Sequence, residues 1–346
     1  MCYKKLSMSK KNSSVNLKNG FKDFVDLSKI YLNFKNQLDY LNKKKYLVAV
    51  SGGPDSLALV ALTKTYSHHK NTKFYYALVD HNIRKNSSQE AKKVKKILKK
   101  KQINLKVLIN KKKILKNVQS EARSVRYEIL SDFCKKNGIK TILTAHNLED
   151  QVETFFIRLS RGSGLKGLSA MKFISKIDNQ LSLCRPLLDT KKKFLSRISK
   201  IIFGTYIKDP SNKNIKFLRT KVRNLRKPLE DSGIKYEQIF KSIKNLSFSK
   251  ATLDGYLEKI FKNLIKRKNN QILINLNKYN KLNNDVKIAV INESIKMLKK
   301  NYYDIRSKKV DNLIKNLNKD SFKRSTLGGC IFFKKGDNLS LKIEKY

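Results

Sequence analysis

Short apolar runs alternate with longer amphipathic stretches over the first half of the chain. The short runs are rich in β-branched and aromatic residues and predict strands at 46–50, 74–80, 104–109 and 140–145. The longer stretches carry apolar residues at helical spacing and predict helices at 21–41, 56–68, 88–101, 119–137 and 149–161. Such alternation predicts an α/β fold, a parallel sheet with helices on both faces, whose ligands bind beyond the carboxyl ends of the strands.

From about residue 230 the pattern changes. Helical periodicity dominates 236–268 and 285–317, and short β-like runs flank the turn at 335–338. This predicts a smaller, mainly helical second domain that ends in a short β-hairpin. The predicted organisation is a flexible basic tail at 1–20, a catalytic domain at 21–228 and a C-terminal domain at 229–346.

Composition narrows the class of protein. The formal net charge of +51 suggests a polyanionic partner, although most of the basic residues are lysines, which a compositional bias alone can supply. Arginine is more selective, and nine of the 13 arginines lie between 123 and 226. The four cysteines form no C-x-x-C pair, which argues against a zinc or iron–sulfur site. No apolar run is long enough to span a membrane and no secretion signal is visible, so we expect a cytoplasmic protein.

The stretch 51–56 reads Ser-Gly-Gly-Pro-Asp-Ser and lies between the first predicted strand and the first helix after it. Glycines let the backbone approach a ligand closely, and the start of a helix presents unpaired N–H groups and a positive dipole end. An anion is therefore the expected occupant. The stretch matches neither G-x-x-x-x-G-K-[ST] nor G-x-G-x-x-G. The alternative is a plain helix cap made by Ser or Asp.

This stretch matches the S-G-G-x-D-S loop of the N-type ATP pyrophosphatases, the PP-loop superfamily. Further motifs follow in order at 79–84, 121–127, 145–154, 161–168, 185–188, 209–212 and 326–329. Together they resemble the tRNA(Ile)-lysidine synthetase family over residues 46 to 346. The chain departs from the family's H-H-x-D-D segment at Asn147 and Glu149, and we expect no counterpart here of the third domain of longer members.

The resemblance implies a reaction. The enzyme would use ATP and Mg²⁺ to adenylate the C2 oxygen of the wobble cytidine in the CAU anticodon of tRNA(Ile). Free L-lysine would then displace AMP, leaving lysidine and changing the tRNA from methionine to isoleucine identity. The stretch lacks the lysine of the G-x-x-x-x-G-K-[ST] loop. This absence fits the implied reaction, because the β- and γ-phosphates leave together as pyrophosphate. The C-terminal domain at 229–346 is expected to bind tRNA, and a homodimer is possible.

The resemblance and the chemistry of the side chains nominate a nucleotide and metal site. The residues expected to bind ATP are Ser51, Gly52, Gly53, Pro54, Asp55 and Ser56. Hard oxygen ligands for Mg²⁺ are expected from Asp55, Glu149 and Asp150, with helix capping as the alternative for the acids.

The catalytic candidates are Asp55, Arg123, Arg126, His146 and Asp150. Arg123 and Arg126 lie three apart on a predicted helix and could neutralise the α-phosphate or hold the carboxylate of lysine, unless they pair with nearby acids. His146 could polarise the nucleotide or guide a proton, or be a packed residue. Glu153, with Arg123, is the candidate for binding lysine.

Two basic segments are candidates for binding tRNA. Arg158, Arg161 and Lys166 flank a glycine-rich loop suited to a splayed anticodon, and Arg219 and Arg223 make a basic stripe for phosphates. A solvated surface is the alternative for both. Two other functions stay open at this point, namely a cytidine thiolase of the same superfamily and a non-catalytic basic RNA-binding protein.

Overall fold

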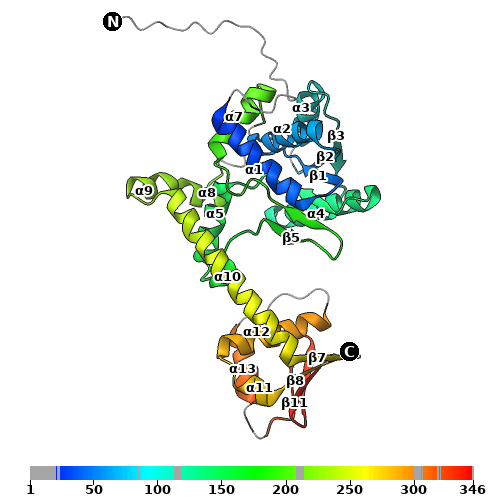
Figure 1. The fold of residues 1–346 in the computed structure, drawn as a ribbon, viewed down its shortest axis with the longest axis vertical. Coiled ribbons are helices and arrows are strands. Elements are labelled where there is room, and N and C mark those ends of the chain that lie inside the picture. Colours follow the sequence, from blue (N-terminus) through cyan, green and yellow to red (C-terminus); the bar gives the residue numbers. More distant parts are fainter. Residues whose placement is uncertain are drawn as a thin grey trace, which may run out of the picture. The chain divides into compact units, whose positions relative to one another are not determined.

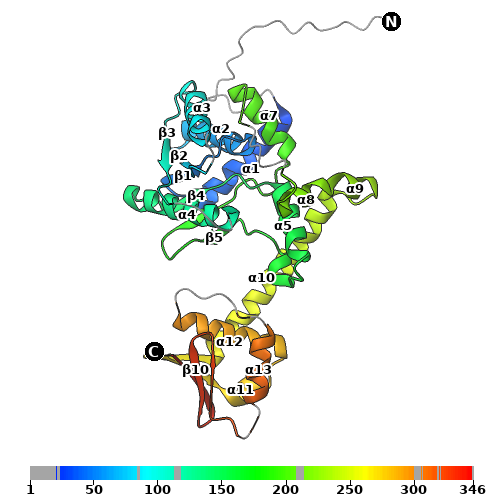
Figure 2. The same ribbon diagram turned by 180° about the vertical axis from the view of Figure 1, so that it is seen from behind.

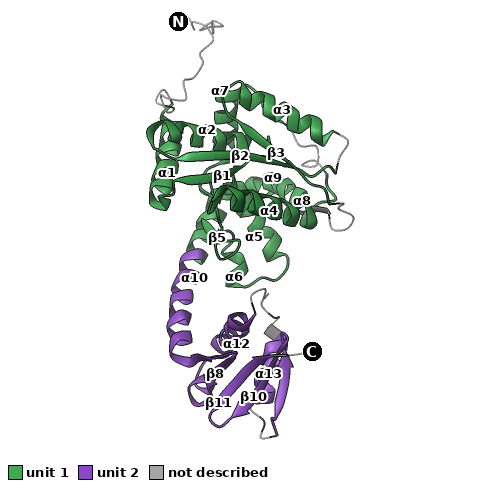
Figure 3. Cartoon of the chain, turned by 90° about the vertical axis from the view of Figure 1, so that its right-hand side faces the viewer, with its two compact units in different colours: residues 1–246 green, residues 247–346 purple. Residues whose placement is uncertain are grey.

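The computed structural model describes residues 21, 24–83, 86–112, 118–207, 214–299, 305, 307–317, 319 and 321–344. The predicted tail at 1–20, Arg84 of the second motif and the motif at 209–212 lie outside these residues. The chain forms two compact units, residues 1–246 and 247–346 (Figure 3). The division falls inside helix α10 (Tyr236–Leu264), whereas the sequence pattern placed the domain boundary at 228/229.

The first unit is built on a six-stranded sheet in the order β3-β2-β1-β4-β6-β5. All neighbours run parallel except the edge pair β5 and β6. The strands are β1 (Lys45–Ala49), β2 (Lys73–Asp80), β3 (Leu105–Ile109), β4 (Thr141–Leu143), β5 (Ile174–Lys176) and β6 (Ser182–Cys184). The four strands expected from the apolar runs are confirmed, and β5 and β6 were not predicted.

Helices cover both faces of this sheet, as predicted (Figures 1 and 2). Alternating side chains of β1 divide between the two layers, with Tyr46 and Val48 on one side and Leu47 on the other. The first side is packed by α1 (Val25–Leu41), α2 (Pro54–His69), α3 (Ser87–Lys99) and α7 (Lys192–Phe203). The second side is packed by α4 (Val118–Asn137), through Leu130 and Cys134. The fold class is therefore confirmed as α/β.

Four shorter helices complete the first unit near the carboxyl ends of the strands. They are α5 (Leu148–Leu159), α6 (Leu165–Leu168), α8 (Leu218–Asn224) and α9 (Arg226–Asp231). The first turns of α10 pack against α5 through Tyr236, Phe240 and Ile243, which join Leu148 and Val152 in a small apolar cluster. This cluster anchors the segment that carries α8 and α9.

The second unit is an antiparallel sheet covered on one face by helices. Its strands are β7 (Ile265–Lys268), β8 (Gln271–Asn275), β9 (Arg324–Leu327), β10 (Cys330–Lys335) and β11 (Asn338–Ile343), in the order β7-β8-β11-β10-β9. Its core joins the inner face of the sheet to α11 (Leu276–Asn280), α12 (Asn284–Leu298) and α13 (Ser307–Leu317). The terminal hairpin is confirmed by the pairing of Lys335 with Asn338. The other three strands were not predicted, and β7 occupies the end of a stretch expected to be helical.

The position of β1 in the sheet determines where a ligand can bind. The chain leaves β1 toward β2 on one side, while β4 pairs with β1 on the other side. The loops that follow β1 and β4 thus diverge at a topological switch point, which is where open α/β sheets bind their ligands. These loops contain 51–56 and 144–147. None of the helices in the described part of the chain is long and apolar enough to cross a membrane.

Gly52 allows a test of how tightly this loop is packed. Its φ of +83° is in the left-handed region, and an added Cβ would lie 2.4 Å from Cγ2 of the buried Val94 on α3. We expect Gly52→Ala to cost on the order of 2 to 4 kcal/mol of stability from strain and clash, and to weaken ATP binding. Thermal unfolding and calorimetric titration with ATP measure both effects.

The matched control is Gly233→Ala. Gly233 has a φ of +86° with no atom within 4 Å of the added Cβ, so it carries the strain without the clash. This variant should be less destabilised and should bind ATP like the wild type. Equal effects of the two substitutions on stability and on ATP affinity would contradict the tight packing of the loop.

Candidate active site

The loop at 51–56 presents an uncapped helix start. Gly53 is the N-cap of α2 and no side chain caps this end. Pro54 at the first helical position has no N–H, so the free donors of the first turn are the amides of Asp55 and Ser56. These amides and the positive end of the helix dipole suit the oxygens of a phosphate group.

The two serines of the loop act mainly on each other. The Ser56 hydroxyl donates to the Gly53 carbonyl at 2.9 Å and accepts from the Ser51 amide at 3.2 Å. The hydroxyl groups of Ser51 and Ser56 are 3.1 Å apart. In this arrangement the single hydroxyl hydrogen of Ser56 holds the turn, and Ser51, whose side chain is exposed, is the serine better placed for a ligand.

Helix α7 and the residues after it brace the same loop. The Ser199 hydroxyl donates to the Pro54 carbonyl, and the Ile207 amide donates to the Gly52 carbonyl at 2.9 Å. Both carbonyls therefore point away from the side that a phosphate would occupy. Two of the loop carbonyls are therefore held by groups of the same chain.

Asp55 combines burial with an unused oxygen. Its Oδ1 is buried and has no hydrogen-bond partner among the described residues. Burial raises the pKa of Asp55 from 3.8 to about 7, Lys192 opposes the rise, and the carboxylates of Asp150 and Glu149 add to it. The pKa of Asp55 therefore depends on the two acids that follow β4, although Asp55 and these acids are far apart in the sequence.

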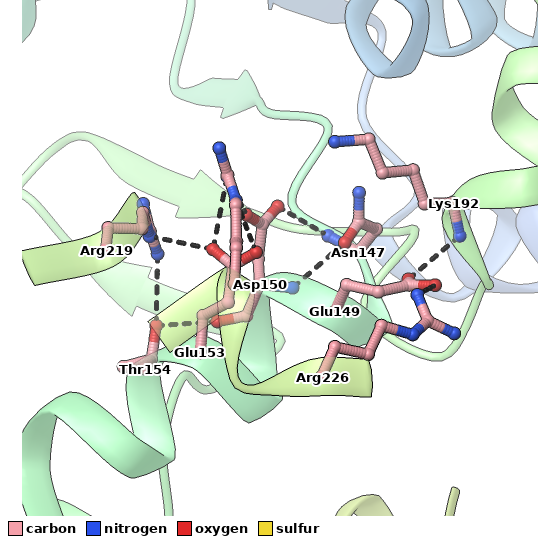
Figure 4. A network of polar contacts seen from close by, with 9 residues as sticks. Asn147, Glu149, Asp150, Glu153, Thr154, Lys192, Arg219 and Arg226 are labelled. Atoms are coloured by element: carbon pink, nitrogen blue, oxygen red, sulfur yellow. Dashed lines mark hydrogen bonds and ion pairs between the residues drawn. The ribbon is translucent and has the colours of Figure 1, made fainter. Parts of the chain in front are cut away.

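Asp150 closes the start of helix α5. The Asn147 side chain accepts from the Asp150 amide at 3.0 Å, and the Asp150 Oδ2 accepts from the Asn147 amide at 3.1 Å (Figure 4). This reciprocal capping box is the structural alternative raised for the acid. The contact engages Oδ2, while Oδ1 lies 3.9 Å from Nη2 of Arg223.

Glu149 links α5 to two other helices. Its Oε2 accepts from the backbone amide of Lys192 at the start of α7 at 2.9 Å, and its Oε1 lies 3.4 Å from Nη1 of Arg226 on α9 (Figure 4). The carboxylate is thus placed at the positive end of the α7 dipole. Both oxygens are engaged, which limits what Glu149 can offer to a metal ion in this arrangement.

Glu153 is a buried carboxylate between two arginines of α8. Arg223 reaches it with Nε at 2.6 Å and Nη2 at 3.1 Å, and Nε of Arg219 lies 3.0 Å from Oε2. Arg219 also donates to the Thr154 hydroxyl at 3.2 Å (Figure 4). Burial raises the pKa of Glu153 in spite of these partners. The cluster fixes α8 against α5.

The predicted tRNA-binding arginines therefore lie in different settings. Arg219 and Arg223 turn toward Glu153, so a contact between their side chains and tRNA stays a prediction. Arg158 donates from Nη1 to the carbonyls of Gly167 at 2.7 Å and Ala170 at 2.9 Å, which shapes the glycine-rich loop. Arg161 and Lys166 are exposed at that loop, where a ligand can reach them.

Arg123 and Arg126 are exposed on α4, where Glu128, one of the nearby acids, pairs with Lys112. Arg126 donates from Nε to Nε2 of His81, which follows β2, at 3.3 Å. Arg123 lies over the ring of Tyr127, with 5.2 Å between its Cζ and the ring centroid. Burial lowers the pKa of His81, and Arg126 adds to this effect, which favours the neutral imidazole that can accept this bond.

His146 lies at the carboxyl end of β4. Its Nδ1 is 2.9 Å from the Thr144 hydroxyl. Burial lowers its pKa to about 4; Asp150 opposes the shift, and the guanidinium groups of Arg185, Arg123 and Arg219 add to it. A neutral imidazole at pH 7 can accept or relay a proton but does not add a positive charge.

The acids fit a magnesium ion only together with a ligand. Within the residues that the structure describes, no group of three or more His, Cys, Asp or Glu side chains is arranged to hold a metal ion. Mg²⁺ is commonly bound by one or two carboxylates with phosphate oxygens and water completing the shell. The unpaired Oδ1 of Asp55 and the nearby Asp150 match that pattern, so the donor chemistry fits.

The chain matches known proteins over most of its length. The PP-loop domain family matches residues 26–229. A tRNA(Ile)-lysidine synthase from Wolbachia pipientis wMel is 31% identical over 320 residues, covering 91% of this chain and 74% of the relative. The chain belongs to the tRNA(Ile)-lysidine synthase family. It is an ATP-dependent ligase with a PP-loop domain.

A second relative supports the same family, and a solved structure supports the same fold. The tRNA(Ile)-lysidine synthase of the Wolbachia of Brugia malayi is 31% identical, covering 92% of this chain and 72% of the relative. Among solved structures, the U34-tRNA thiolase from Methanococcus maripaludis with its [4Fe-4S] cluster has a TM-score of 0.54 at 19% identity, covering 64% of this chain and 78% of that chain. The likeness to the thiolase structure shows a shared fold.

Several groups at the site were missed by sequence reasoning. The amide of Lys192, the hydroxyl of Ser199 and the guanidinium of Arg226 come from the region after β6, where no element had been predicted. Arg226 was signalled only as one of the clustered arginines, and His81 only as part of the 79–84 motif. The role of a backbone amide such as that of Lys192 cannot be read from residue types, because every residue except proline has this group.

The buried cluster around Glu153 can be tested by removing its charge. Glu153→Gln leaves two guanidinium groups facing a neutral amide in a buried place, so we expect a loss of about 3 kcal/mol of stability. Glu230→Gln is the matched control, because Glu230 accepts from Arg226 in an exposed pair four residues apart and should cost less than about 0.5 kcal/mol. Urea unfolding of both variants measures the difference, and equal losses would argue against the role given to Glu153.

The raised pKa of Asp55 predicts a pH dependence. The folded chain keeps this proton to a pH of about 7, while the unfolded chain releases it near 3.8, so folded stability falls as pH rises through that window. Asp55→Asn removes the effect. Without nucleotide or divalent ions the variant should match the wild type near pH 4 and exceed it above pH 7, by on the order of 2 kcal/mol. A difference in Tm that does not change with pH would contradict the assignment.

Proposed function

We propose that this chain joins the ε-amine of free lysine to C2 of the wobble cytidine in tRNA(Ile) bearing the CAU anticodon. One observation carries the proposal: a bare helix start at the switch point of the sheet lies beside a set of buried carboxylates, in a chain that aligns over 91% of its length with a tRNA(Ile)-lysidine synthase. The product would be lysidine, which changes the identity of the tRNA from methionine to isoleucine.

The reaction would proceed in two displacements. In the first, the C2 oxygen of the cytidine attacks the α-phosphorus of ATP, the bond to the β-phosphate oxygen breaks, and pyrophosphate leaves. In the second, the amine of lysine attacks C2, the bond from C2 to the adenylated oxygen breaks, and AMP leaves. The amine gives up one proton, which a nearby carboxylate can accept.

The loop at 51–56 would hold the leaving pyrophosphate. Its free amides at Asp55 and Ser56 stand at the positive end of α2, and the braced carbonyls of Gly52 and Pro54 keep acceptors away from the anion. A loop that grips only the β- and γ-phosphates needs no lysine to follow the transferred group. Mg²⁺ held by Asp55 and Asp150 would offset the negative charge that builds up on pyrophosphate.

Arg126 is well placed to meet the nucleotide from the α4 side. His81 accepts from Nε of Arg126, and this contact holds the exposed guanidinium at the carboxyl edge of the sheet, where a planar fork can meet an anion. The α-phosphate gains charge in the first displacement, so a planar fork at this point would stabilise the transition state. Arg123, one helical turn earlier, would contact the carboxylate of the substrate lysine.

The ammonium group of lysine needs an acidic pocket. We assign the direct contact to Asp150, whose Oδ1 is not used by the capping box. Glu153 would then take part in lysine binding by holding Arg223 in place, because its own oxygens are already engaged by Arg223 and Arg219. A homodimer stays a prediction.

A cytidine thiolase of the same fold is a weaker candidate. Such an enzyme needs reactive cysteines, and the described Cys134, Cys184 and Cys330 are all buried. Burial raises the pKa of the first two thiols to about 12, which disfavours the nucleophilic thiolate.

The test is incorporation of labelled lysine into tRNA(Ile) with the CAU anticodon, in the presence of ATP and Mg²⁺. The wild type should transfer the label and release AMP and pyrophosphate. Asp150→Asn should lower the rate at least about 100-fold, because it weakens both the ammonium contact and the metal site. Asp132→Asn, at an exposed position on α4, is the control and should keep wild-type activity. Undiminished labelling by Asp150→Asn, or none by the wild type, would contradict the proposal.

A further inference from the structure

The start of helix α7 carries a run of lysines that the helix itself does not favour. Lys191 is the N-cap, and Lys192 and Lys193 follow in the first turn, which contains no acidic residue. A positive charge at this end opposes the helix dipole and costs a little stability. The run is therefore better explained by what each lysine contacts than by the local structure.

Two of these three lysines have partners for their ammonium groups. Lys191 forms an ion pair with Glu237, and the ammonium of Lys193 lies 5.1 Å from the ring centroid of Phe194. Lys192 is different, because only its backbone amide is engaged and its ammonium has no ion pair or hydrogen bond among the described residues. The residue is also partly buried. It therefore holds a positive charge at the site that is available to a ligand.

The ammonium of Lys192 acts on the acid of the phosphate loop. Its side chain extends away from Glu149 and Arg226 (Figure 4). Among the charged groups that change the pKa of Asp55, Lys192 has the largest effect, and it lowers this pKa. The two side chains form no ion pair, so they lie near each other without direct contact. An ammonium and a carboxylate arranged in this way can hold one ligand from two sides.

Helix α7 gives Lys192 a defined position relative to the loop at 51–56. The Lys192 amide is held by Glu149 at 2.9 Å, and the Ser199 hydroxyl, two turns later on the helix, donates to the Pro54 carbonyl. Ser199 is fully buried, and the apolar side of α7 packs in the same core as α2. The helix that carries Lys192 is therefore attached to the phosphate loop itself.

We propose that Lys192 binds the β- and γ-phosphates of ATP and stabilises the pyrophosphate as it leaves. This inference rests on the proposed function, which assigns the loop at 51–56 to the pyrophosphate. The loop contains no lysine, and its amides offer only partial positive charges to a group with several negative charges. The ammonium from α7 supplies the full positive charge that the loop lacks.

The role of this ammonium in the first displacement is electrostatic. When the bond from the α-phosphorus breaks, its electron pair stays on the oxygen that becomes part of pyrophosphate. Lys192 offsets the added charge by donating a hydrogen bond to the phosphate oxygens and keeps its own proton. Asp55 would approach the same phosphates through Mg²⁺, so the acid and the lysine would hold the leaving group together.

The test compares the binding of pyrophosphate, ATP and AMP to the wild type and to Lys192→Gln, by calorimetric titration in the presence of Mg²⁺. The substitution keeps the backbone amide that Glu149 binds, so the start of α7 should stay intact. Affinity for inorganic pyrophosphate and for ATP should fall at least about tenfold. Affinity for AMP, which has neither the β- nor the γ-phosphate, should be unchanged. Unchanged affinity for pyrophosphate, or an equal loss for AMP, would overturn the proposal.

Lys193→Gln is the matched control. Lys193 is exposed in the same turn of α7, so this substitution removes the same charge from the same end of the helix. The variant should bind pyrophosphate like the wild type, and Lys192→Arg, which keeps a cation, should recover most of the affinity that Lys192→Gln loses. Equal losses in Lys193→Gln and Lys192→Gln would show that only the overall charge matters, and this result would contradict a direct contact with phosphate.

A kinetic measurement separates this inference from the proposed function. With tRNA(Ile) bearing the CAU anticodon, Lys192→Gln should slow the exchange of labelled pyrophosphate into ATP at least about tenfold. Failure of the proposed function is recognised on the wild type, which would then transfer no labelled lysine to this tRNA. The titration with pyrophosphate requires neither tRNA nor lysine, so it decides the role of Lys192 in either case.

Discussion

The site brings four carboxylates together in a partly buried place, which costs free energy. The rest of the site is arranged to offset this cost. Asp55, Glu149, Asp150 and Glu153 all lie at the carboxyl edge of the parallel sheet, and burial opposes their charged forms. Two kinds of positive partner offset this cost. Backbone amides do so at the start of α5 and α7, and the guanidinium groups of Arg219, Arg223 and Arg226 do so from α8 and α9. Asp55 is the acid whose Oδ1 is left without a partner.

This arrangement separates two uses of positive charge in the chain. Several arginines of the first unit bind groups of the same chain, with Glu153 and Glu149 held by α8 and α9 and loop carbonyls held by Arg158. A planar fork is suited to such fixed contacts. Lysines dominate the exposed surface instead, where a flexible ammonium can follow a moving phosphate. Internal acids thus account for Arg219, Arg223 and Arg226 among the nine arginines between 123 and 226, and internal carbonyl groups account for Arg158 and Arg185.

The sequence predicted the central part of the fold because its signals are local. β1 to β4 are apolar runs next to clear helical periods, and 51–56 joins a strand to a helix in a recognisable way. β5 and β6 have only three residues each, too few to show an alternation. β7 follows α10 without a break, so its residues continue a helical pattern, and only pairing with β8 makes them a strand.

The site was predictable in its residues but not in their partners. A spacing of four between Arg219 and Arg223 is the same whether the helix face meets solvent or an acid. The partner, Glu153, lies 70 residues before Arg223, and no local pattern connects them. Likewise Glu149 keeps an acidic side chain where the family pattern has one, but its contact with the Lys192 amide arises only when α7 is packed in place.

Helix α7 contacts both Glu149 and the loop at 51–56. No sequence motif indicates this link. The helix starts against Glu149, and its later part, with the residue Ile207 beyond it, holds the carbonyls of the phosphate loop. A loop fastened in this way has little freedom to mould itself around a nucleotide. The entropy of ordering it is lost during folding and not at each binding event.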